Sequence, residues 1–243
     1  GLAASDSQML HQDNLPLSPE AGDLFGYTIT AGDFDNDGYS DLAIGVPRDT
    51  TTTDDSGNEA GLVTIVSGST SGLDMNDTKI FNQGHLNAIL ESGDRFGFSL
   101  SGGDFNKDGF DDLVIGVPYE DIEFTGSVLE NAGIIHAVFG SSGGLSSNGN
   151  AIFSQNTPGI AGSSETGDAF GYSLASGDFD KDGFSDLAIG VPFEDIEAKN
   201  AVNAGAVNII FGTNGGLTVQ GDQMLYQSVV GLMGTSEGFD RFG

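Results

Sequence analysis

The chain contains 243 residues, and its 36 acidic side chains outnumber 7 basic ones to give a formal net charge of −29. This charge argues against nucleic acid and anionic membrane surfaces as partners, because their phosphate groups would be repelled. The chain has no cysteine, so disulfides do not stabilise it. It has no run of 18 apolar residues and no basic-then-apolar leader. We therefore expect no membrane insertion, and either a mature soluble protein or a segment of a longer one.

The sequence consists mainly of one unit that occurs three times. Its most similar stretch begins at Asp33, Asp104 and Asp178, which sets intervals of 71 residues (104 minus 33) and 74 residues (178 minus 104). Each copy opens with Gly-Asp-x-Phe-Gly and an alternating segment, followed by an apolar run that ends in Ile-Gly-Val-Pro. A second apolar run and a short last segment, such as residues 80–83, complete the unit. These four segments have strand character, and none has helical periodicity.

Four short strands per unit predict an all-β fold made of β-propeller blades with four antiparallel strands each. We interpret residues 1–243 as one partial propeller with three full blades and partial ones at its ends. The predicted boundaries are residues 22–92 for unit 1, 93–166 for unit 2 and 167–236 for unit 3.

The two ends of the chain repeat parts of the unit. Gln8–Gln12 nearly duplicate Gln223–Gln227, so residues 1–21 are predicted to be the outer strand of a preceding blade and a linker. Residues 237–243 contain Phe-Gly and are predicted to start a further blade. Propellers close with about four to eight blades, so we expect either a segment of a longer protein or self-association that closes the ring.

A nine-residue acidic loop follows the first predicted strand of every unit, at residues 33–41, 104–112 and 178–186. Oxygen-bearing side chains occupy its positions one, three, five and nine, and glycine occupies position six. Such an irregular, carboxylate-rich set of oxygens suits Ca²⁺ better than Mg²⁺. An EF-hand opens in the same way but needs glutamate at position twelve, where this chain has Ile44, Ile115 and Ile189. One copy alone would be typical of a solvated acidic turn, whereas three copies predict three calcium sites.

Phe25-Gly26, the acidic loop and Ile44-Gly45-Val46-Pro47 together resemble the FG-GAP repeat of integrin α-subunit propellers, with valine in place of the motif's alanine. The resemblance recurs in all three units and implies a seven-bladed propeller with Ca²⁺ in the hairpin loop between the first two strands of a blade. The implied ligands are four side chains and the main-chain carbonyl at position seven: Asp33, Asp35, Asp37, Tyr39 and Asp41; Asp104, Asn106, Asp108, Phe110 and Asp112; Asp178, Asp180, Asp182, Phe184 and Asp186. Asn106 replaces an acid, so we expect the second site to bind more weakly.

The chain differs from integrin α-subunits in three respects. Its repeat interval is longer, every unit keeps an acidic loop, and cysteine is absent. These differences indicate a microbial or otherwise distant relative, so the partner choice of integrins does not transfer to it.

In this family the metal loops lie on one face, and ligands usually bind the other. That other face is predicted to hold the second-to-third-strand and fourth-to-first-strand connections: residues 48–59, 119–131 and 193–203, and residues 84–91, 156–165 and 228–237. An aromatic–acidic element, residues 119–123 and 193–197, repeats there, while unit 1 has Arg48-Asp49 instead. The element is either a binding surface for a cationic group or sugar hydroxyls, or a structural turn with solvated acids.

Three further features are interpreted as structural. Residues 140–144 formally match a nucleophile elbow, but their counterparts in the other units are plain glycine-rich turns. His11, His85 and His136 are solitary, so we interpret each as a structural histidine that is either exposed or satisfied by hydrogen bonds. The aromatic residue at loop position two alternates with the ligands and is predicted to point into the blade core; it is Phe34, Phe105 or Phe179.

Two classes of function remain open. The first is a non-catalytic calcium-binding scaffold, extracellular or at a cell surface, that binds a protein or glycan in adhesion. The second is an enzyme or its accessory part, because related propellers occur in polysaccharide lyases and phospholipases. A lyase or glycosidase needs a non-repeated group of acid and base residues, and we find none in the sequence, which favours binding. Extracellular calcium modules often have Kd values of roughly 10⁻⁴–10⁻³ M, which do not suit cytosol.

Overall fold

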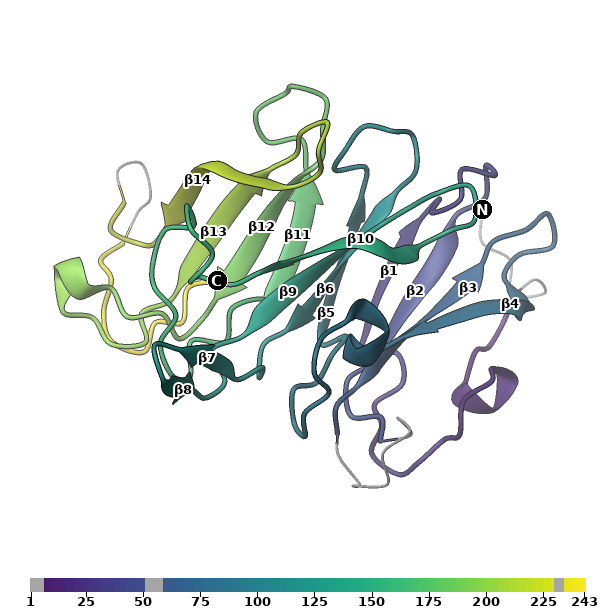
Figure 1. Cartoon of the computed structure of the whole chain (residues 1–243), viewed down its shortest axis with the longest axis horizontal. Coiled ribbons are helices and arrows are strands. Elements are labelled where there is room, and N and C mark those ends of the chain that lie inside the picture. The colour runs from purple at the N-terminus through teal and green to yellow at the C-terminus, as the bar shows by residue number, and fades with distance from the viewer. Residues whose placement is uncertain (1–6, 51–58, 230–233) are drawn as a thin grey trace.

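The computed structural model describes residues 7–50, 59–229 and 234–243. In this part of the chain the strands form three four-stranded antiparallel sheets and one two-stranded sheet (Figure 1). The helical elements there are short 3₁₀ helices: η2 (Gln12–Asn14), η3 (Gln83–Leu86) and η4 (Glu197–Lys199). The predicted all-β fold with four-stranded blades is confirmed.

Each four-stranded sheet is one blade, and its strands are paired in sequence order. Blade 1 contains β1 (Thr28–Gly32), β2 (Asp41–Val46), β3 (Leu62–Ser67) and β4 (Asp74–Phe81). Blade 2 contains β5 (Ser99–Gly103), β6 (Asp112–Val117), β9 (Ile134–Phe139) and β10 (Ser146–Phe153). Blade 3 contains β11 (Ser173–Gly177), β12 (Asp186–Val191), β13 (Ala206–Phe211) and β14 (Thr218–Leu225). The strands fall inside the predicted units, whose exact boundaries stay a prediction.

The second-to-third-strand connections differ between blades. Blade 2 forms a hairpin of β7 (Ile122–Phe124) and β8 (Ser127–Leu129) there, whereas blade 3 forms η4. The hairpin turn places Thr125 and Gly126 at φ values of 51° and 85°, the left-handed region that a tight two-residue turn requires. Most of the corresponding connection of blade 1 lies outside the described residues. The two aromatic–acidic elements therefore lead into different local structures.

The first hairpin of each blade fixes the position of the acidic loop. In blade 1, Thr28 lies opposite Gly45 and Gly32 lies opposite Asp41, so the loop begins directly after the last strand pair. The same register recurs in the other blades. Position nine of each loop is thus the first residue of the second strand, and its carboxyl group is held at the end of the sheet.

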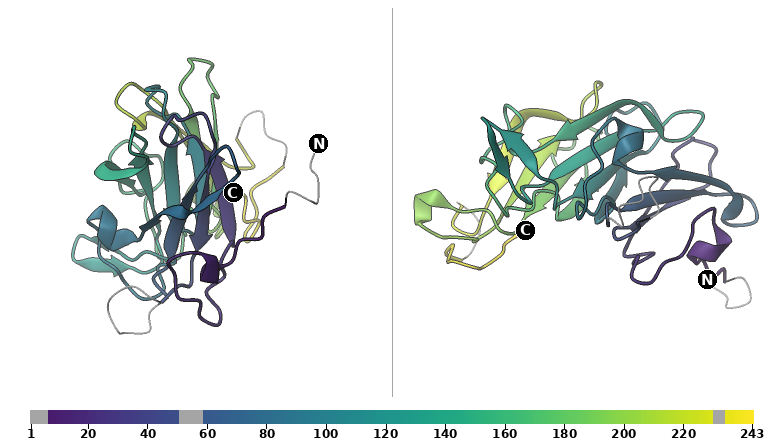
Figure 2. Two further views of the ribbon diagram at one scale, coloured as in Figure 1. Left: turned by 90° about the vertical axis from the view of Figure 1, so that its right-hand side faces the viewer. Right: turned by 60° about the horizontal axis from the view of Figure 1, so that its bottom comes forward.

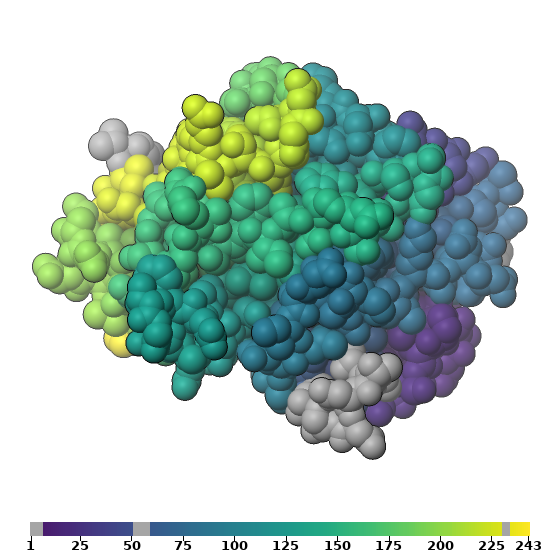
Figure 3. All heavy atoms as spheres, in the orientation of Figure 1, coloured from purple at the N-terminus to yellow at the C-terminus, as the bar shows by residue number. Residues whose placement is uncertain are grey.

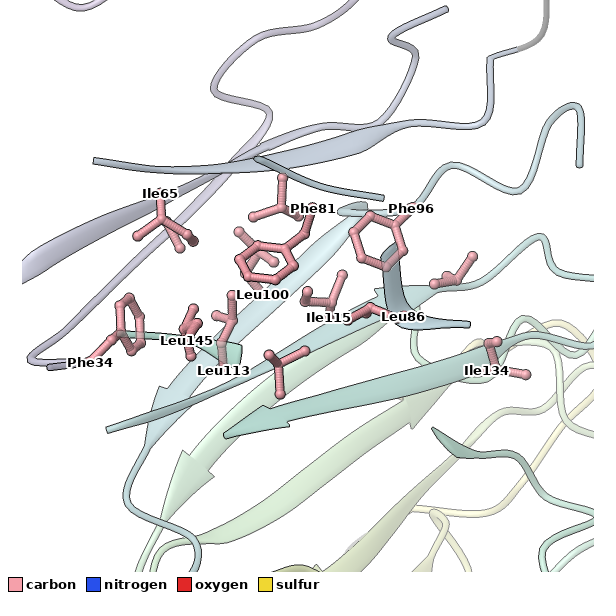
Figure 4. Packing of buried hydrophobic residues seen from close by; sticks show 14 residues of the cluster. Phe34, Ile65, Phe81, Leu86, Phe96, Leu100, Leu113, Ile115, Ile134 and Leu145 are labelled. Carbon is pink, nitrogen blue, oxygen red and sulfur yellow. The ribbon is translucent and has the colours of Figure 1, made fainter. Parts of the chain in front are cut away.

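The hydrophobic core lies between the blades. Blades 1 and 2 share one cluster of buried side chains, and blades 2 and 3 share another. Figure 4 shows the first cluster, in which Phe34 and Phe81 of blade 1 lie near Leu113 and Ile115 of blade 2. Burial of each such side chain contributes about 1.5–3 kcal/mol. Each blade therefore depends on its neighbour for the burial of its apolar face.

The exposure of the phenylalanine at loop position two depends on whether a neighbouring blade covers it. Phe34 and Phe105 are 0% exposed, and each packs in the cluster between its own blade and the next one. Phe179 is 48% exposed, so the prediction that it points into a core is wrong for this residue. Within the described residues, no further blade covers that side of blade 3.

A Phe-Gly pair joins each blade to the one before it. The main-chain N–H groups of Phe96, Phe170 and Phe242 donate to the carbonyls of Ala60, Ala132 and Ala204, at 2.8, 2.9 and 2.9 Å. The glycine after each alanine has a positive φ, such as 83° at Gly61 and Gly133. A Cβ atom at these glycines would overlap the carbonyl of the incoming phenylalanine. Only glycine allows both this backbone conformation and this close approach.

The two ends of the chain lie against blades 1 and 3. The side-chain amide of Gln8 forms two hydrogen bonds with the main chain of Leu73, at 3.0 and 3.2 Å. Residues 7–11 form no strand, and residues 1–6 lie outside the described part of the chain. Phe242 occupies on blade 3 the place that Phe96 occupies on blade 1. The assignment of both ends to adjoining blades stays a prediction.

The three blades follow one another in sequence order across the molecule (Figures 1 and 2). The first strand of blade 2, β5, is in contact with both β1 and β11. On the surface in Figure 3, blade 2 lies between blades 1 and 3. In Figure 1 the acidic loops lie along the upper edge, the β7–β8 hairpin lies at the lower left, and the connection that contains η4 lies at the left.

Candidate functional site

The acidic loop of blade 1 is organised by hydrogen bonds from its own main chain. The carboxylate of Asp33 accepts the N–H groups of Asp37 and Gly38, both at 3.0 Å, and Asp35 accepts the N–H of Asp37 at 3.1 Å. Gly38 has a φ of 91°, which confirms the predicted sharp turn. A carboxylate has about four lone-pair sites, so these oxygens keep acceptor capacity for a cation.

The same bonds recur in the other two loops. Asp104 and Asp178 accept the N–H groups at loop positions five and six, at 3.0–3.1 Å. Position three accepts the N–H of position five in both, at 2.9 Å for Asn106 and 3.0 Å for Asp180. The amide oxygen of Asn106 therefore takes the place of a carboxylate oxygen. Its Nδ2 donates to Asp108 at 2.9 Å, so part of the acceptor capacity of that carboxylate is already used.

The aspartate at loop position nine also has a structural role. Asp112 is buried and accepts the N–H groups of Phe105 and Gly140, at 3.1 and 2.9 Å. Asp41 and Asp186 make the equivalent pairs of bonds. Burial raises the pKa of Asp112 to about 7, although these two hydrogen bonds favour its charged form. These aspartates tie the acidic loop to the turn after the third strand.

Two loops bring three carboxyl groups together. One oxygen each from Asp33, Asp35 and Asp37 lie within 4.8 Å of one another, and so do oxygens of Asp178, Asp180 and Asp186. Clustered oxygens with no nitrogen or sulfur suit a hard cation such as Ca²⁺. The loops therefore fit the predicted metal. Which residues are ligands, including the carbonyls of Tyr39, Phe110 and Phe184, stays a prediction.

An aromatic row lies at the opposite end of the first strands. The ring of Phe98 lies 5.0 Å from that of Tyr27 and 4.8 Å from that of Tyr172, so neighbouring blades are in contact. Tyr119 and Phe193 extend the row, at 5.6 Å from Phe98 and 6.2 Å from Tyr172. Two guanidinium groups cover its outer members: Arg95 lies 4.4 Å from the ring centre of Tyr119, and Arg241 lies 5.0 Å from that of Phe193.

The acids of the aromatic–acidic elements are divided between two structural roles. Asp121 and Asp195 each accept a main-chain N–H at 2.7 Å, from Asn131 and Asn203, which supports the interpretation as a structural turn. Glu194 is only 5% exposed, so the expectation of solvated acids is wrong for this residue. In blade 1, Arg48 instead bonds to Glu59.

Each blade holds a glutamine beside two carboxyl groups, an arrangement that the sequence analysis missed. Gln12 donates to Asp23 and Asp49, at 2.9 and 3.3 Å. In the other blades Gln83 donates to Glu120 and Gln155 donates to Glu194, both at 2.6 Å. Asp94 and Asp168 are the second carboxyl groups and are both 2% exposed. The sequence signals the glutamine, because Gln83 and Gln155 both lie two residues after a fourth strand and Gln12 stands in a matching stretch, but it does not indicate the carboxyl partners.

The carboxyl pairs of blades 2 and 3 have raised pKa values. Burial, followed by repulsion from Asp94, raises the pKa of Glu120 to about 8, and burial raises the pKa of Asp94 to about 6. In blade 3, burial and then repulsion from Glu194 raise the pKa of Asp168 to about 8. Burial raises the pKa of Glu194 to about 7. Each pair therefore retains a proton near neutral pH.

His136 differs from the expected structural histidine. It is 0% exposed, and neither ring nitrogen has a hydrogen-bond partner within the described residues. Its ring packs on Phe96 at 5.6 Å, and burial lowers its pKa to about 4. His136 is thus a neutral packing residue. Residues 140–144 follow β9 and lead into β10, so they form a strand-to-strand turn and no nucleophile elbow.

Comparison with known proteins identifies the repeat. The FG-GAP repeat matches more than half of the chain, at residues 25–66, 96–138 and 170–209. The chain belongs to the FG-GAP repeat family. The matched stretches of this FG-GAP protein each run from the Phe-Gly pair into the third strand and contain an acidic loop. The predicted resemblance is confirmed.

The FG-GAP protein is similar to two kinds of larger protein. It is 34% identical to integrin alpha-5 of Xenopus laevis over 90% of its own length and 18% of the relative. It is 32% identical to integrin alpha pat-2 of Caenorhabditis briggsae, over 89% and 16% of the two chains. It is 33% identical to phosphatidylinositol-glycan-specific phospholipase D of Mus musculus, over 69% of its own length and 18% of the relative. It thus spans less than a fifth of these relatives. None of its described helices is long and apolar enough to cross a membrane.

Proposed function

We propose that this FG-GAP protein is a non-catalytic, calcium-binding propeller scaffold, extracellular or at a cell surface, that binds a protein or glycan in adhesion. The observation that carries the proposal is the repeated hydrogen-bond pattern of the three acidic loops. All three loops make the same main-chain bonds to their side-chain oxygens, although they differ in sequence at positions three, four, seven and eight, and the first and third loops each bring three carboxyl groups together. Bound Ca²⁺ would supply the positive charge that such clusters require. The likeness to integrin alpha chains supports the adhesive part of the proposal.

The face opposite the acidic loops is the proposed ligand surface. Its aromatic row is partly accessible, because Tyr27 is 50% exposed. Two acidic cavities lie beside it: one of 180 Å³ lined by Glu91, Asp94 and Tyr119, and one of 230 Å³ lined by Glu165, Asp195 and other residues. Aromatic faces bind cations and sugar rings, and acids bind ammonium, guanidinium and hydroxyl groups. A cationic side chain of a protein or a hydroxyl-rich glycan fits this combination.

Chelation tests the calcium part of the proposal. One Ca²⁺ at a hundred times its Kd stabilises a fold by about 2.7 kcal/mol, so three sites would contribute about 8 kcal/mol. We expect excess chelator to lower the melting temperature markedly, as measured by scanning calorimetry, and added Ca²⁺ to restore it. Mg²⁺ at the same ionic strength is the control. An unchanged melting curve in chelator would refute calcium binding.

A glycan and peptide array tests the ligand surface. We expect binding to be lost when Tyr119 or Tyr172 is changed to alanine and to persist when exposed Tyr39, on the loop face, is changed. Equal loss in all three variants would place the ligand elsewhere.

An enzymatic role is the second candidate, favoured by the likeness to the phospholipase D chain. In that case the propeller would be an accessory module or part of a secreted polysaccharide- or lipid-cleaving enzyme. A turnover screen on polysaccharides and on phosphatidylinositol-glycan substrates separates the two functions, because a scaffold alone gives no product.

Self-association to close the ring is also proposed, because the outer face of blade 3 leaves Phe179 exposed. Light scattering in millimolar calcium measures the mass: a dimer supports closure by a second copy, and a monomer argues against it.

A further inference from the structure

The residue at position four of the first and second acidic loops extends toward the next loop. Asn36, Lys107 and Lys181 have φ values of 56°, 60° and 66°, so all three adopt the left-handed conformation. The side chain of Asn36 lies close to Gly109 of the second loop. The Nζ of Lys107 lies 3.2 Å from the main-chain oxygen of Asp182 in the third loop. The same position thus delivers a neutral amide to the second loop and a positive charge to the third.

Lys107 contacts two residues of the predicted third calcium site. Its ammonium group donates to Asp182 and lies 5.0 Å from the ring centre of Phe184, over the aromatic face. The three clustered carboxyl groups of this loop belong to Asp178, Asp180 and Asp186. Lys107 is exposed and is one of only 7 basic residues in the chain.

A fixed positive charge beside a cation site has two opposite effects. It repels the incoming Ca²⁺, which weakens binding. In the calcium-free protein it offsets the repulsion among the carboxylates, which stabilises the empty loop. We propose that Lys107 is a built-in cation that sets the calcium affinity of the third loop, and this inference rests on the proposed calcium-binding function. The second loop receives no such charge from the loop before it, because Asn36 occupies the corresponding place.

The size of the effect follows from Coulomb's law. For an assumed separation of about 8 Å in water, a single and a double positive charge repel enough to weaken binding about fivefold. Both groups are near the surface, so salt reduces the repulsion, whose range is about 10 Å at 0.1 M ionic strength. The third site is therefore weaker than its four aspartates alone would make it, and its affinity rises relative to the other sites as salt increases.

The test is calcium titration calorimetry of the whole chain with matched exchanges at position four. Lys107→Asn copies the residue of the first loop, and we expect it to tighten one site about fivefold at low salt, with a smaller gain at 0.5 M salt. Lys107→Arg keeps the charge and should leave the affinity unchanged. The reverse exchange, Asn36→Lys, should weaken the second site. Melting in excess chelator should show a lower melting temperature for Lys107→Asn than for the wild type.

The paired readouts separate this role from a structural one. If Lys107 only braced the loop, Lys107→Asn would weaken calcium binding and destabilise the calcium-free protein together, which overturns the inference. Unchanged affinity in Lys107→Asn overturns it as well, while the proposed function stands if the wild type binds calcium. A wild type that binds no calcium refutes both. Adding Asp180→Asn to remove the third site should abolish the effect of Lys107→Asn, and its persistence would place the effect at another loop.

Discussion

The carboxyl pair Asp94–Glu120 makes the stability of the protein depend on pH, and Glu120→Gln should reduce that dependence. Glutamine has the same shape as protonated glutamate, accepts from Gln83 through its oxygen and donates to Asp94 through its nitrogen. Burial, which is the main cause of the raised pKa of Asp94, is unchanged by the substitution. The substitution thus keeps the hydrogen bonds and removes the titration of Glu120.

The sign and size of the effect follow from proton linkage. In the unfolded chain both groups titrate near pH 4. In the folded protein they titrate at about 6 and about 8, so the folded pair holds two extra protons between about pH 5 and pH 6 and one between about pH 6 and pH 8. Stability is fully present below the unfolded pKa values and is lost as the pH rises through the folded ones. The extra proton that Glu120 holds gives about 1.4 kcal/mol per pH unit, or at most about 4 kcal/mol between pH 5 and pH 8, and this is the part that the substitution removes. Because Glu120 is not fully buried, we expect about 2 kcal/mol.

Urea unfolding followed by circular dichroism measures this effect, since the chain has no tryptophan for fluorescence. The free energy of unfolding of the wild type, at saturating calcium, should fall more steeply between pH 5 and pH 8 than that of Glu120→Gln. The exposed Glu123→Gln is the control, and its curve should parallel the wild type. Glu194→Gln should act in the same way through blade 3. Parallel curves for the wild type and Glu120→Gln would refute the reasoning.

Three further predictions concern packing. Phe105→Ala should destabilise the protein by about 3–5 kcal/mol, whereas Phe179→Ala, at a 48% exposed position, should cost less than about 1 kcal/mol in the same urea assay. Gly133→Ala should destabilise far more than Gly126→Ala, because both have a positive φ but only Gly133 faces a neighbouring carbonyl; equal melting temperatures would contradict this. His136→Leu should flatten the loss of stability that accompanies acidification from about pH 6.5 to pH 4, since the buried imidazole stays neutral while the unfolded one gains a proton.

The sequence predicts the strands and the acidic loops well because both are local. The strand register and the sharp turn at Gly38 follow from alternation and from glycine at fixed positions. Contacts between blades are not local. Whether a phenylalanine is covered depends on the next sheet, so Phe105 and Phe179 have opposite exposures in the same motif.

The contacts of the carboxyl pairs and the local structure of the second-to-third-strand connections also could not be predicted from the sequence pattern. Gln83 meets Glu120 across 37 residues, and no local spacing indicates that contact. The two aromatic–acidic elements begin alike, but Thr125-Gly126 closes a hairpin in one, and the other continues into η4. The reach of Lys107 into the third loop likewise depends on how two blades are placed side by side.

The joint between blades has a consequence for how such chains change in evolution. Every junction uses the same parts, a Phe-Gly pair that fits against an Ala-Gly step, as at Phe96 with Ala60 and Phe170 with Ala132. Each blade therefore contacts the preceding one through the same Phe-Gly and Ala-Gly pairs, whatever its position in the chain. Duplication or deletion of a whole unit would leave every joint intact, while a cut inside a unit would leave an unmatched edge. The repeat can therefore be gained or lost as a whole unit, and its loops and connections can diverge without disturbing the contacts between blades.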